Sequence, residues 1–350
     1  MKYSVVLPHL GESVPFYMRD CVEQIRLWNP PADTDIYILL DRIHASAAFW
    51  TELADKHGVT LVYTDSLVPT PHHTYFATHF KGDTAFRKGY WKHVKERFYY
   101  VEELMAAFSL EHVISMEYDV LLYTTLRSIV DPGRAAATLR MVRDNEDRGH
   151  PALLYIPSTA AMADFTQFLT TLLDSPLEDM QSLAAYADRY PAKIHYFPVI
   201  TEARNRSVPV RRSKQGHTTS RPGFLSEDSE TFGLLFDSLV VGQWIGGIDS
   251  RNTGGHKVAN YENESALYSI REMPFTWKRS EGPLPAGRPL PLSLWQSALA
   301  RTLWQPFLDG RPLATIHVHS KSLASFRSDR ETTPTDDYDV RSLHAQLFPN

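Results

Sequence analysis

The first 63 residues alternate between short apolar runs and longer amphipathic segments, and this alternation limits the possible folds more than any other feature. The apolar runs predict buried strands over residues 3–7, 35–40 and 59–63. The segments between them predict helices over residues 14–28 and 45–57, ended by Asn29-Pro30-Pro31 and by Gly58. A strand–helix–strand–helix–strand order is typical of a parallel sheet with right-handed crossovers, so the predicted fold class is α/β.

The same patterns continue with less regularity along the rest of the chain. Further strands are predicted over residues 112–116, 120–123, 153–156, 194–200 and 314–319. A further helix is predicted over residues 161–173, one long helix or two over residues 86–108, and a full or partial helix over residues 236–248. Residues 65–81 are expected to be irregular, and the basic segment 202–230 is either a solvated loop or a mobile flap over an anionic ligand.

Composition excludes several classes of protein. A formal net charge of −5 gives no electrostatic reason to expect nucleic-acid binding. The single cysteine, Cys21, cannot form an intramolecular disulfide, which favours a cytoplasmic location. No run of 18 apolar residues is present, and the apolar start of the chain is too short for a signal peptide. We therefore expect no transmembrane segment, although peripheral membrane contact stays open.

Two carboxylates follow the predicted strand that ends at Met116. Glu117 and Asp119 stand at positions i and i+2, so on an extended segment their side chains point the same way. The carboxyl end of a parallel strand is where α/β sheets bind ligands. The pair suits a hard divalent cation that bridges substrate phosphates, although a polar strand end without function is the commoner meaning of such a triplet.

A second group of polar residues follows the last predicted strand. His317 and His319 share one face of an extended segment, and their imidazoles are potential metal ligands. Lys321 is suited to hold a phosphate as a point charge. Histidines near a C-terminus are also often merely exposed to solvent.

Two further acids frame a glycine-containing segment. Asp237 precedes the predicted helix over residues 236–248, where it is either a helix cap or a catalytic base. Asp249 follows Gly246-Gly247 and is either a turn residue or an alternative base. Elsewhere, Arg97 lies in an aromatic helix and needs an anionic partner, which is either an acidic side chain or a nucleotide diphosphate.

Together these segments resemble the GT-A type of nucleotide-sugar glycosyltransferase, in particular its bacterial and large-virus relatives. Residues 116–123 are similar to the metal-binding Asp-x-Asp motif, with Glu117 in the first acidic place, and residues 97–105 to the helix before it. Residues 236–249 resemble an acceptor-side segment, and residues 317–321 the C-terminal histidine segment that completes the metal site.

The resemblance implies one GT-A domain over residues 1–326, with helices on both faces of a mostly parallel sheet. Residues 1–125 would form the donor half, 126–326 the acceptor half and 327–350 a tail. The implied activity is glycosyl transfer from a nucleotide-diphosphate sugar to a glycan or other hydroxyl acceptor.

The resemblance also implies a role for each site residue. Mn²⁺ or Mg²⁺ would be held by Asp119, Glu117 and His319. The donor would contact Pro8, Asp41, Arg97, Glu117 and Lys321. The general base would be Asp237, with Asp249 as the alternative. Two rival functions use the same residues: a metal-dependent nucleotide phosphohydrolase, and a non-catalytic protein that binds nucleotide sugars.

Overall fold

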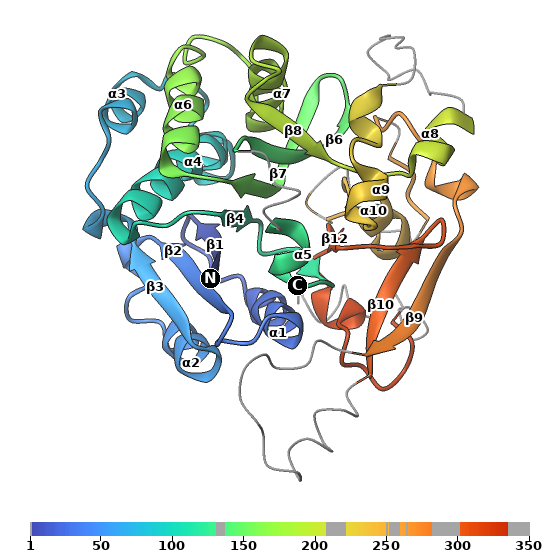
Figure 1. Cartoon of the computed structure of the whole chain (residues 1–350). Helices are drawn as coiled ribbons and strands as arrows, with labels where there is room; N and C mark the ends of the chain where they lie inside the picture. Colours follow the sequence, from blue (N-terminus) through green and yellow to red (C-terminus); the bar gives the residue numbers. More distant parts are fainter. Residues whose placement is uncertain are drawn as a thin grey trace. The chain divides into compact units, whose positions relative to one another are not determined.

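The computed structural model describes residues 2–130, 137–207, 222–249, 251, 260–263, 265–281 and 302–334. The chain divides into two compact units, each made of several segments (Figure 1). Unit 1 consists of Met1–Phe16, Thr34–Glu117 and Val130–Tyr196, and unit 2 of Tyr17–Asp33, Tyr118–Ile129 and Phe197–Asn350. Each unit draws on residues from both sides of the predicted division at residue 125, and that division into donor and acceptor halves stays a prediction.

A seven-stranded sheet forms the centre of unit 1. Its spatial order is β3 (Val59–Tyr63), β2 (Thr34–Leu40), β1 (Tyr3–His9), β4 (Val113–Met116), β7 (Arg148–Ile156), β6 (Leu139–Asn145) and β8 (Ile194–Phe197). Strand β1 is parallel to β2 and β4, and β2 is parallel to β3. Strand β7 is antiparallel to both of its neighbours, β4 and β6. The predicted α/β class with a mostly parallel sheet is confirmed.

Helices cover both faces of this sheet, and the burial of β1 is consistent with this. All seven of its residues are buried, as expected for a strand covered on two sides. Val6 joins the core cluster under α4 (Tyr90–Phe108), α6 (Thr159–Thr170) and α7 (Asp179–Arg189). His9 points to the opposite face, where its ring lies 5.5 Å from that of Trp50 in α2 (Ala48–His57).

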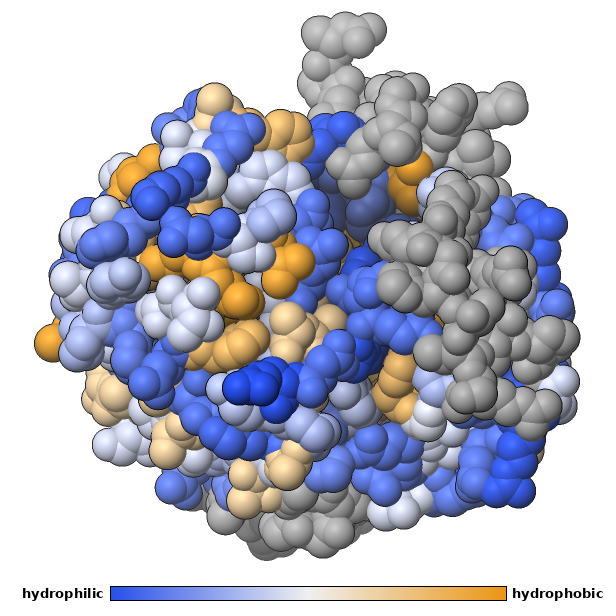
Figure 2. Space-filling model, turned by 90° about the horizontal axis from the view of Figure 1, so that it is seen from above, coloured by the Kyte–Doolittle hydropathy of each residue, from blue (hydrophilic) through white to orange (hydrophobic). Residues whose placement is uncertain are grey.

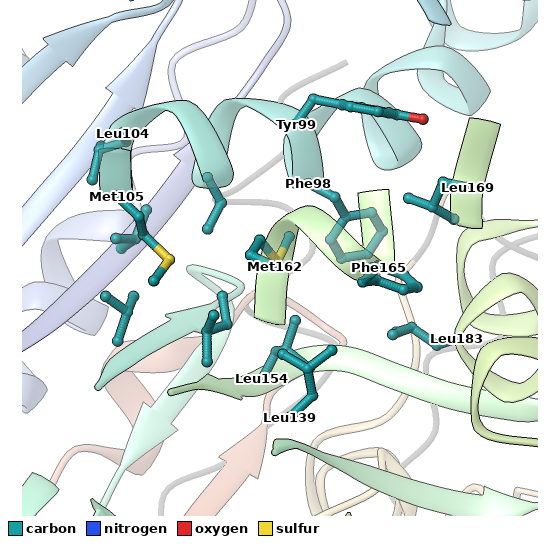
Figure 3. Close-up of a cluster of buried hydrophobic side chains, with 14 of the residues drawn as sticks. Phe98, Tyr99, Leu104, Met105, Leu139, Leu154, Met162, Phe165, Leu169 and Leu183 are labelled. Carbon is teal, nitrogen blue, oxygen red and sulfur yellow. The ribbon is translucent and has the colours of Figure 1, made fainter. Parts of the chain in front are cut away.

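A large core cluster lies between the sheet and α4, α6 and α7. Figure 3 shows Phe98 of α4 beside Phe165 of α6, and their rings meet edge to face with centroids 5.2 Å apart. Met162, Leu169 and Leu183 fill the space around them. Burying side chains of this size contributes roughly 1.5–3 kcal/mol each, so this cluster is a main source of stability for unit 1.

One prediction for residues 65–108 was wrong. The segment expected to be irregular contains helix α3 (Pro71–His79), which starts with a proline and is capped by the Thr70 side chain accepting from the His73 backbone. Residues 86–108, predicted as one long helix or two, are divided at Gly89, which has a φ of +93°. Helix α4 therefore starts at Tyr90, after a short 3₁₀ turn, η3 (Phe86–Lys88).

Unit 2 is built from smaller elements. Its helices are α1 (Met18–Trp28), most of α5 (Leu126–Val130), α8 (Glu202–Ser207), α9 (Ser229–Phe232) and α10 (Val240–Gly246). Its strands form an antiparallel pair, β5 (Val120–Leu122) with β12 (Thr315–His317), and an antiparallel sheet of β9 (Phe275–Glu281), β10 (Thr302–Leu308) and β11 (Arg311–Pro312).

The beginning of the predicted C-terminal tail is packed into unit 2. Ser328 is fully buried, and the amide of Gln24 in α1 donates to its hydroxyl over 2.7 Å. The indole of Trp28 donates to the same oxygen over 3.1 Å. Residues 335–350, which belong to the same predicted tail, lie outside the described residues, as do residues 208–221 of the basic segment.

The exposed large apolar side chains that the structure describes all belong to unit 1: Phe16, Ile43, Val68, Tyr75, Phe86, Tyr90 and Phe108. On the face drawn in Figure 2, apolar residues form small groups among hydrophilic ones. Such scattered exposure is ordinary for a folded protein. None of the described helices combines the length and apolar character needed to cross a membrane. The compartment stays a prediction.

Candidate active site

The pairing of β5 with β12 determines where Asp119 lies. His317 is opposite Val120 in this antiparallel ladder, so Asp119, one residue earlier, comes next to the end of β12. The Val318 backbone N–H donates to the Asp119 carbonyl over 2.8 Å, which extends the ladder by one further bond. Two segments that are almost 200 residues apart thus meet inside unit 2 at the predicted acidic motif.

Asp119 is the electrostatic centre of this site. Its carboxylate oxygen Oδ2 lies 3.1 Å from His317 Nε2 and accepts a hydrogen bond from the Lys321 ammonium. Burial opposes ionisation of this carboxyl, but the charges and hydrogen bonds of His317 and Lys321 outweigh burial and hold its pKa well below the usual range. Asp119 therefore carries a negative charge at neutral pH, in a place where water screens it little.

The local backbone differs from the prediction for the acidic pair. Residues 117–119 are not extended, because Tyr118 and Asp119 form a turn between β4 and β5. The i, i+2 rule for extended segments therefore does not apply here. Glu117 ends its segment of unit 1, whereas Asp119 belongs to unit 2.

Within unit 1, Glu117 is bound by Arg97, the residue that was predicted to contact the donor diphosphate. Arg97 Nη1 lies 2.6 Å from Glu117 Oε1, and Nη2 lies 2.5 Å from Asp179 Oδ2 at the start of α7. Burial disfavours the guanidinium charge, but these two carboxylates outweigh it and raise the pKa of Arg97. Of the two partners considered for Arg97, the structure shows the acidic side chains; diphosphate binding by Arg97 stays a prediction.

The two histidines at the end of β12 have different surroundings. His317 faces Asp119, whereas His319 Nδ1 accepts a hydrogen bond from the Asp249 backbone N–H over 2.9 Å. Burial, together with the charges of Lys321 and His317, lowers the pKa of His319 to about 3. Its imidazole is therefore neutral at pH 7, and because Nδ1 accepts, the ring proton sits on Nε2. In this tautomer His319 is a hydrogen-bond donor, and His317 is the better placed potential metal ligand.

Asp249 is held in a side-chain ion pair. Arg251 lies against it with Nη2 2.6 Å from Oδ2 and Nε 3.1 Å from Oδ1. Burial raises the pKa of Asp249, but the bonds from Arg251 prevail and lower it to about 2. The Arg251 side chain is 55% exposed, so this partner has room to move.

The hydrogen bonds of the Asp237 side chain are those of a helix cap. Oδ1 accepts from the Val241 backbone N–H over 2.8 Å, and Oδ2 accepts from the N–H groups of Gly242 and His317 over 2.9 Å each. The residue is 5% exposed. Burial raises the pKa of this carboxyl, although the three backbone donors oppose the rise. The geometry therefore favours the cap over the base.

The two residues predicted to lie near the base and ribose belong to unit 1. Pro8 does not end its strand, as the sequence suggested, but lies buried within β1, opposite Leu39. Asp41 follows β2, and its carboxylate accepts from the Gly11 backbone over 2.9 Å and from the Thr64 hydroxyl over 3.2 Å. Asp41 thus ties together the loops after three neighbouring strands, at the carboxyl edge of the parallel sheet.

Several residues that contact the predicted site residues were missed from the sequence. Asp179, Arg251 and Tyr17, whose ring lies 5.7 Å from that of Tyr118, carried no motif of their own. The one available signal was the spacing Asp249-x-Arg251, which allows a local ion pair in a turn. Asp179 is 82 residues from Arg97 in the chain, and no local pattern connects them.

The chemistry of these side chains fits a divalent cation. Asp119 and His317 present an oxygen and a nitrogen 3.1 Å apart within unit 2, and both are potential metal ligands. Glu117, two residues before Asp119 in the chain, stays a predicted third ligand. Carboxylate and imidazole are both accepted by Mn²⁺, and carboxylates by Mg²⁺. The Lys321 ammonium already forms an ion pair with Asp119 Oδ2.

No family model and no curated protein matches this chain. Solved structures do resemble it. Mouse xyloside xylosyltransferase 1 is 10% identical, with a TM-score of 0.40, over 59% of this chain and 90% of the mouse chain. A mutant of LgtC is 12% identical, with a TM-score of 0.43, over 64% and 83%. The bifunctional glycosyltransferase WbbM is 11% identical, with a TM-score of 0.41, over 57% and 39%. Likenesses this distant assign neither an activity nor a residue role to this chain.

Proposed function

We propose that this protein is a metal-dependent glycosyltransferase that moves a sugar from a nucleotide-diphosphate sugar to a hydroxyl acceptor. The observation that carries the proposal is the buried contact of Asp119 with His317 and Lys321, which joins an oxygen ligand, a nitrogen ligand and a phosphate-binding cation within unit 2. The resemblance of the four sequence motifs to GT-A enzymes supports the same function. An acceptor that is a glycan would place the protein in glycan biosynthesis.

The residues of this chain have distinct roles in the proposed reaction. Asp119 and His317, with Glu117, would hold a Mn²⁺ or Mg²⁺ ion, which would supply charge neutralisation for the diphosphate. Lys321 adds a positive charge for the leaving diphosphate, and the neutral His319 donates a hydrogen bond from Nε2. Pro8 and Asp41 contact the nucleotide. The acceptor oxygen forms a bond to the anomeric carbon while the bond to the β-phosphate oxygen breaks, and the nucleoside diphosphate leaves with the bonding electron pair.

The acceptor proton needs a base in this scheme, and Asp249 is the better placed of the two predicted acids. Its partner Arg251 is a half-exposed side chain that an acceptor can displace. The partners of Asp237 are backbone amides in α10 and β12, which cannot turn away without disrupting both elements. Release from Arg251 would raise the pKa of Asp249 above the value of about 2 that it has in this ion pair.

A thermal-shift screen tests donor binding directly. Nucleotide sugars with uridine, guanosine and cytidine bases are added one at a time, with Mn²⁺ or with a chelator. A ligand that binds only the native state raises the unfolding temperature, and the rise grows with the ratio of ligand concentration to dissociation constant. We expect at least one nucleotide sugar to stabilise the protein in Mn²⁺ and to lose most of this effect with the chelator. Equal shifts with and without metal would contradict metal dependence.

The shared oxygen of Asp119 leads to a prediction about Lys321. A cation that binds Asp119 competes with the Lys321 ammonium for the same oxygen, Oδ2. Lys321→Ala should therefore bind Mn²⁺ alone more tightly, yet bind a nucleoside diphosphate more weakly, because a phosphate-binding charge is lost. The loss should be larger for the diphosphate than for the monophosphate.

Calorimetric titration of each ligand measures these affinities. Lys278→Ala is the matched control, because Lys278 is an exposed lysine of β9 that lies over the Phe307 ring. If Lys321→Ala weakens Mn²⁺ binding, or weakens both nucleotides equally, Lys321 does not have the proposed role.

A further inference from the structure

Backbone amides from two separate elements hold the Asp237 carboxylate in unit 2. Its two oxygens accept three backbone hydrogen bonds, two from the first turn of α10 and one from the His317 N–H at the end of β12. A carboxylate that accepts several backbone N–H groups fixes the relative position of the segments that supply them. Asp237 thus connects helix α10 to the backbone of the residue whose side chain faces Asp119.

Helix α10 lies unusually close to β12 at the same point. A side chain built on Gly242 would place its Cβ 1.8 Å from the His317 carbonyl oxygen. Only glycine permits this approach, because the obstacle is backbone and cannot rotate away. The residue before the helix, Leu239, has a left-handed backbone with a φ of +74°, a strained conformation for a branched side chain.

Thr315 completes the connection two residues before His317. Its hydroxyl oxygen accepts from the Asp237 backbone N–H over 3.2 Å, and Thr315 is itself paired with Leu122 of β5. The backbone on both sides of His317 is therefore bonded: to Asp237 through His317 N, and to Asp119 through Val318 N. The His317 imidazole has little freedom to move away from Asp119.

We infer that Asp237 is a positioning residue for the cation site: it fixes the His317 backbone so that the imidazole and the Asp119 carboxylate meet a divalent cation together. This inference rests on the proposed function. Groups that orient metal ligands without touching the metal typically change metal affinity 10- to 100-fold when they are replaced. The role differs from that of a general base, whose loss lowers the rate and leaves metal binding unchanged.

Direct measurement of Mn²⁺ binding separates the two roles. Free Mn²⁺ is followed by its electron paramagnetic resonance signal in titrations of the intact protein, without nucleotide. Asp237→Asn keeps the size of the side chain but places an amide NH₂ against backbone N–H donors. We expect its dissociation constant for Mn²⁺ to rise ~10- to 100-fold. Asp309→Asn is the matched control, because Asp309 is another acid of unit 2, paired with Arg204 away from the motif, and its variant should bind Mn²⁺ like the wild type.

A milder pair of variants keeps the inference testable if Asp237→Asn does not fold. Thr315→Val removes the hydroxyl that accepts from Asp237, and Thr315→Ser retains it. We expect Thr315→Val to weaken Mn²⁺ binding about fivefold, the effect of one neutral hydrogen bond, and Thr315→Ser to bind as the wild type does.

Each result of the Mn²⁺ titrations either supports or overturns the inference. Weaker Mn²⁺ binding in folded Asp237→Asn or in Thr315→Val supports the inference. Wild-type Mn²⁺ affinity in the folded variants overturns it, and if sugar transfer then falls by ~10²- to 10⁴-fold in Asp237→Asn, Asp237 is the base. A wild-type protein that binds no Mn²⁺ overturns the proposed function, and the inference with it.

Discussion

Asp119→Asn should lower sugar transfer by roughly 10²- to 10³-fold and remove most Mn²⁺-dependent donor binding, since it deletes the central charge of the site. Asn keeps the shape of the side chain but provides no carboxylate for a cation. It also leaves Lys321 and His317 next to a neutral group in a buried place. Loss of one partner from a buried pair typically costs about 3–5 kcal/mol, so the variant should also be less stable than the wild type in the absence of metal.

The pH dependence of stability provides an independent check on Asp119. Its pKa is lowered in the folded protein, so its contribution to stability is present above the unfolded value of about 3.9 and is lost as the pH falls through the lower folded value. The stability difference between the wild type and Asp119→Asn should therefore shrink below about pH 4.

Chemical denaturation at a series of pH values measures this difference, and activity is measured at matched folded fractions. Asp309→Asn again serves as the control for loss of a paired acid in unit 2. If Asp119→Asn transfers sugar at close to the wild-type rate, the assignment of the cation site to Asp119 is wrong.

The second large effect on stability is expected for Arg97, whose guanidinium bridges two carboxylates in unit 1. Arg97→Met would leave Glu117 and Asp179 without their shared cation, in a place where the arginine side chain is only 13% exposed. We expect about 3–5 kcal/mol of destabilisation at pH 7. Arg97→Lys should be impaired too, because one ammonium cannot reproduce two guanidinium contacts in different directions.

The loss of stability in Arg97→Met should be smaller at acid pH and in a double variant. Without the guanidinium, folding would bind protons to the two acids, and stability then rises as the pH falls. Arg97→Met combined with Asp179→Asn removes one of the unpaired charges and should recover part of the lost stability. Urea unfolding at pH 5 and pH 7 tests both points. A stable Arg97→Met that binds nucleoside diphosphate poorly would instead support Arg97 as a ligand of the diphosphate.

The central sheet could be predicted because its strands carry the evidence in their own sequence. Strand β1 is buried on both faces, so most of its residues are apolar and follow one another in a run, and the same holds for much of β2. Helix α3 could not be predicted in this way, because it has no apolar stripe. It is held by contacts from afar, including His73 Nδ1 at 2.7 Å from Glu103 Oε1 in α4.

The acidic site could be predicted only in part, for a related reason. The sequence pointed to the segments that carry Asp119 and Lys321, but it could not distinguish His317 from His319, which differ only in which backbone and side chains face them. Asp237 was likewise ambiguous. Its role depends on the His317 N–H, 80 residues away, and such a long-range bond leaves no trace in local spacing.

The most direct test of the proposed function is product analysis with the purified protein, Mn²⁺ and the nucleotide sugar that stabilises it best. Reactions are run with and without a panel of simple glycosides as acceptors, and with a chelator in place of the metal. We predict that nucleoside diphosphate and a glycosylated product appear together, in equal amounts, only when metal and a suitable acceptor are both present. Release of nucleoside monophosphate or phosphate at a rate that no acceptor changes would contradict glycosyl transfer and identify a nucleotide phosphohydrolase. Tight donor binding without any turnover would identify a non-catalytic binding protein.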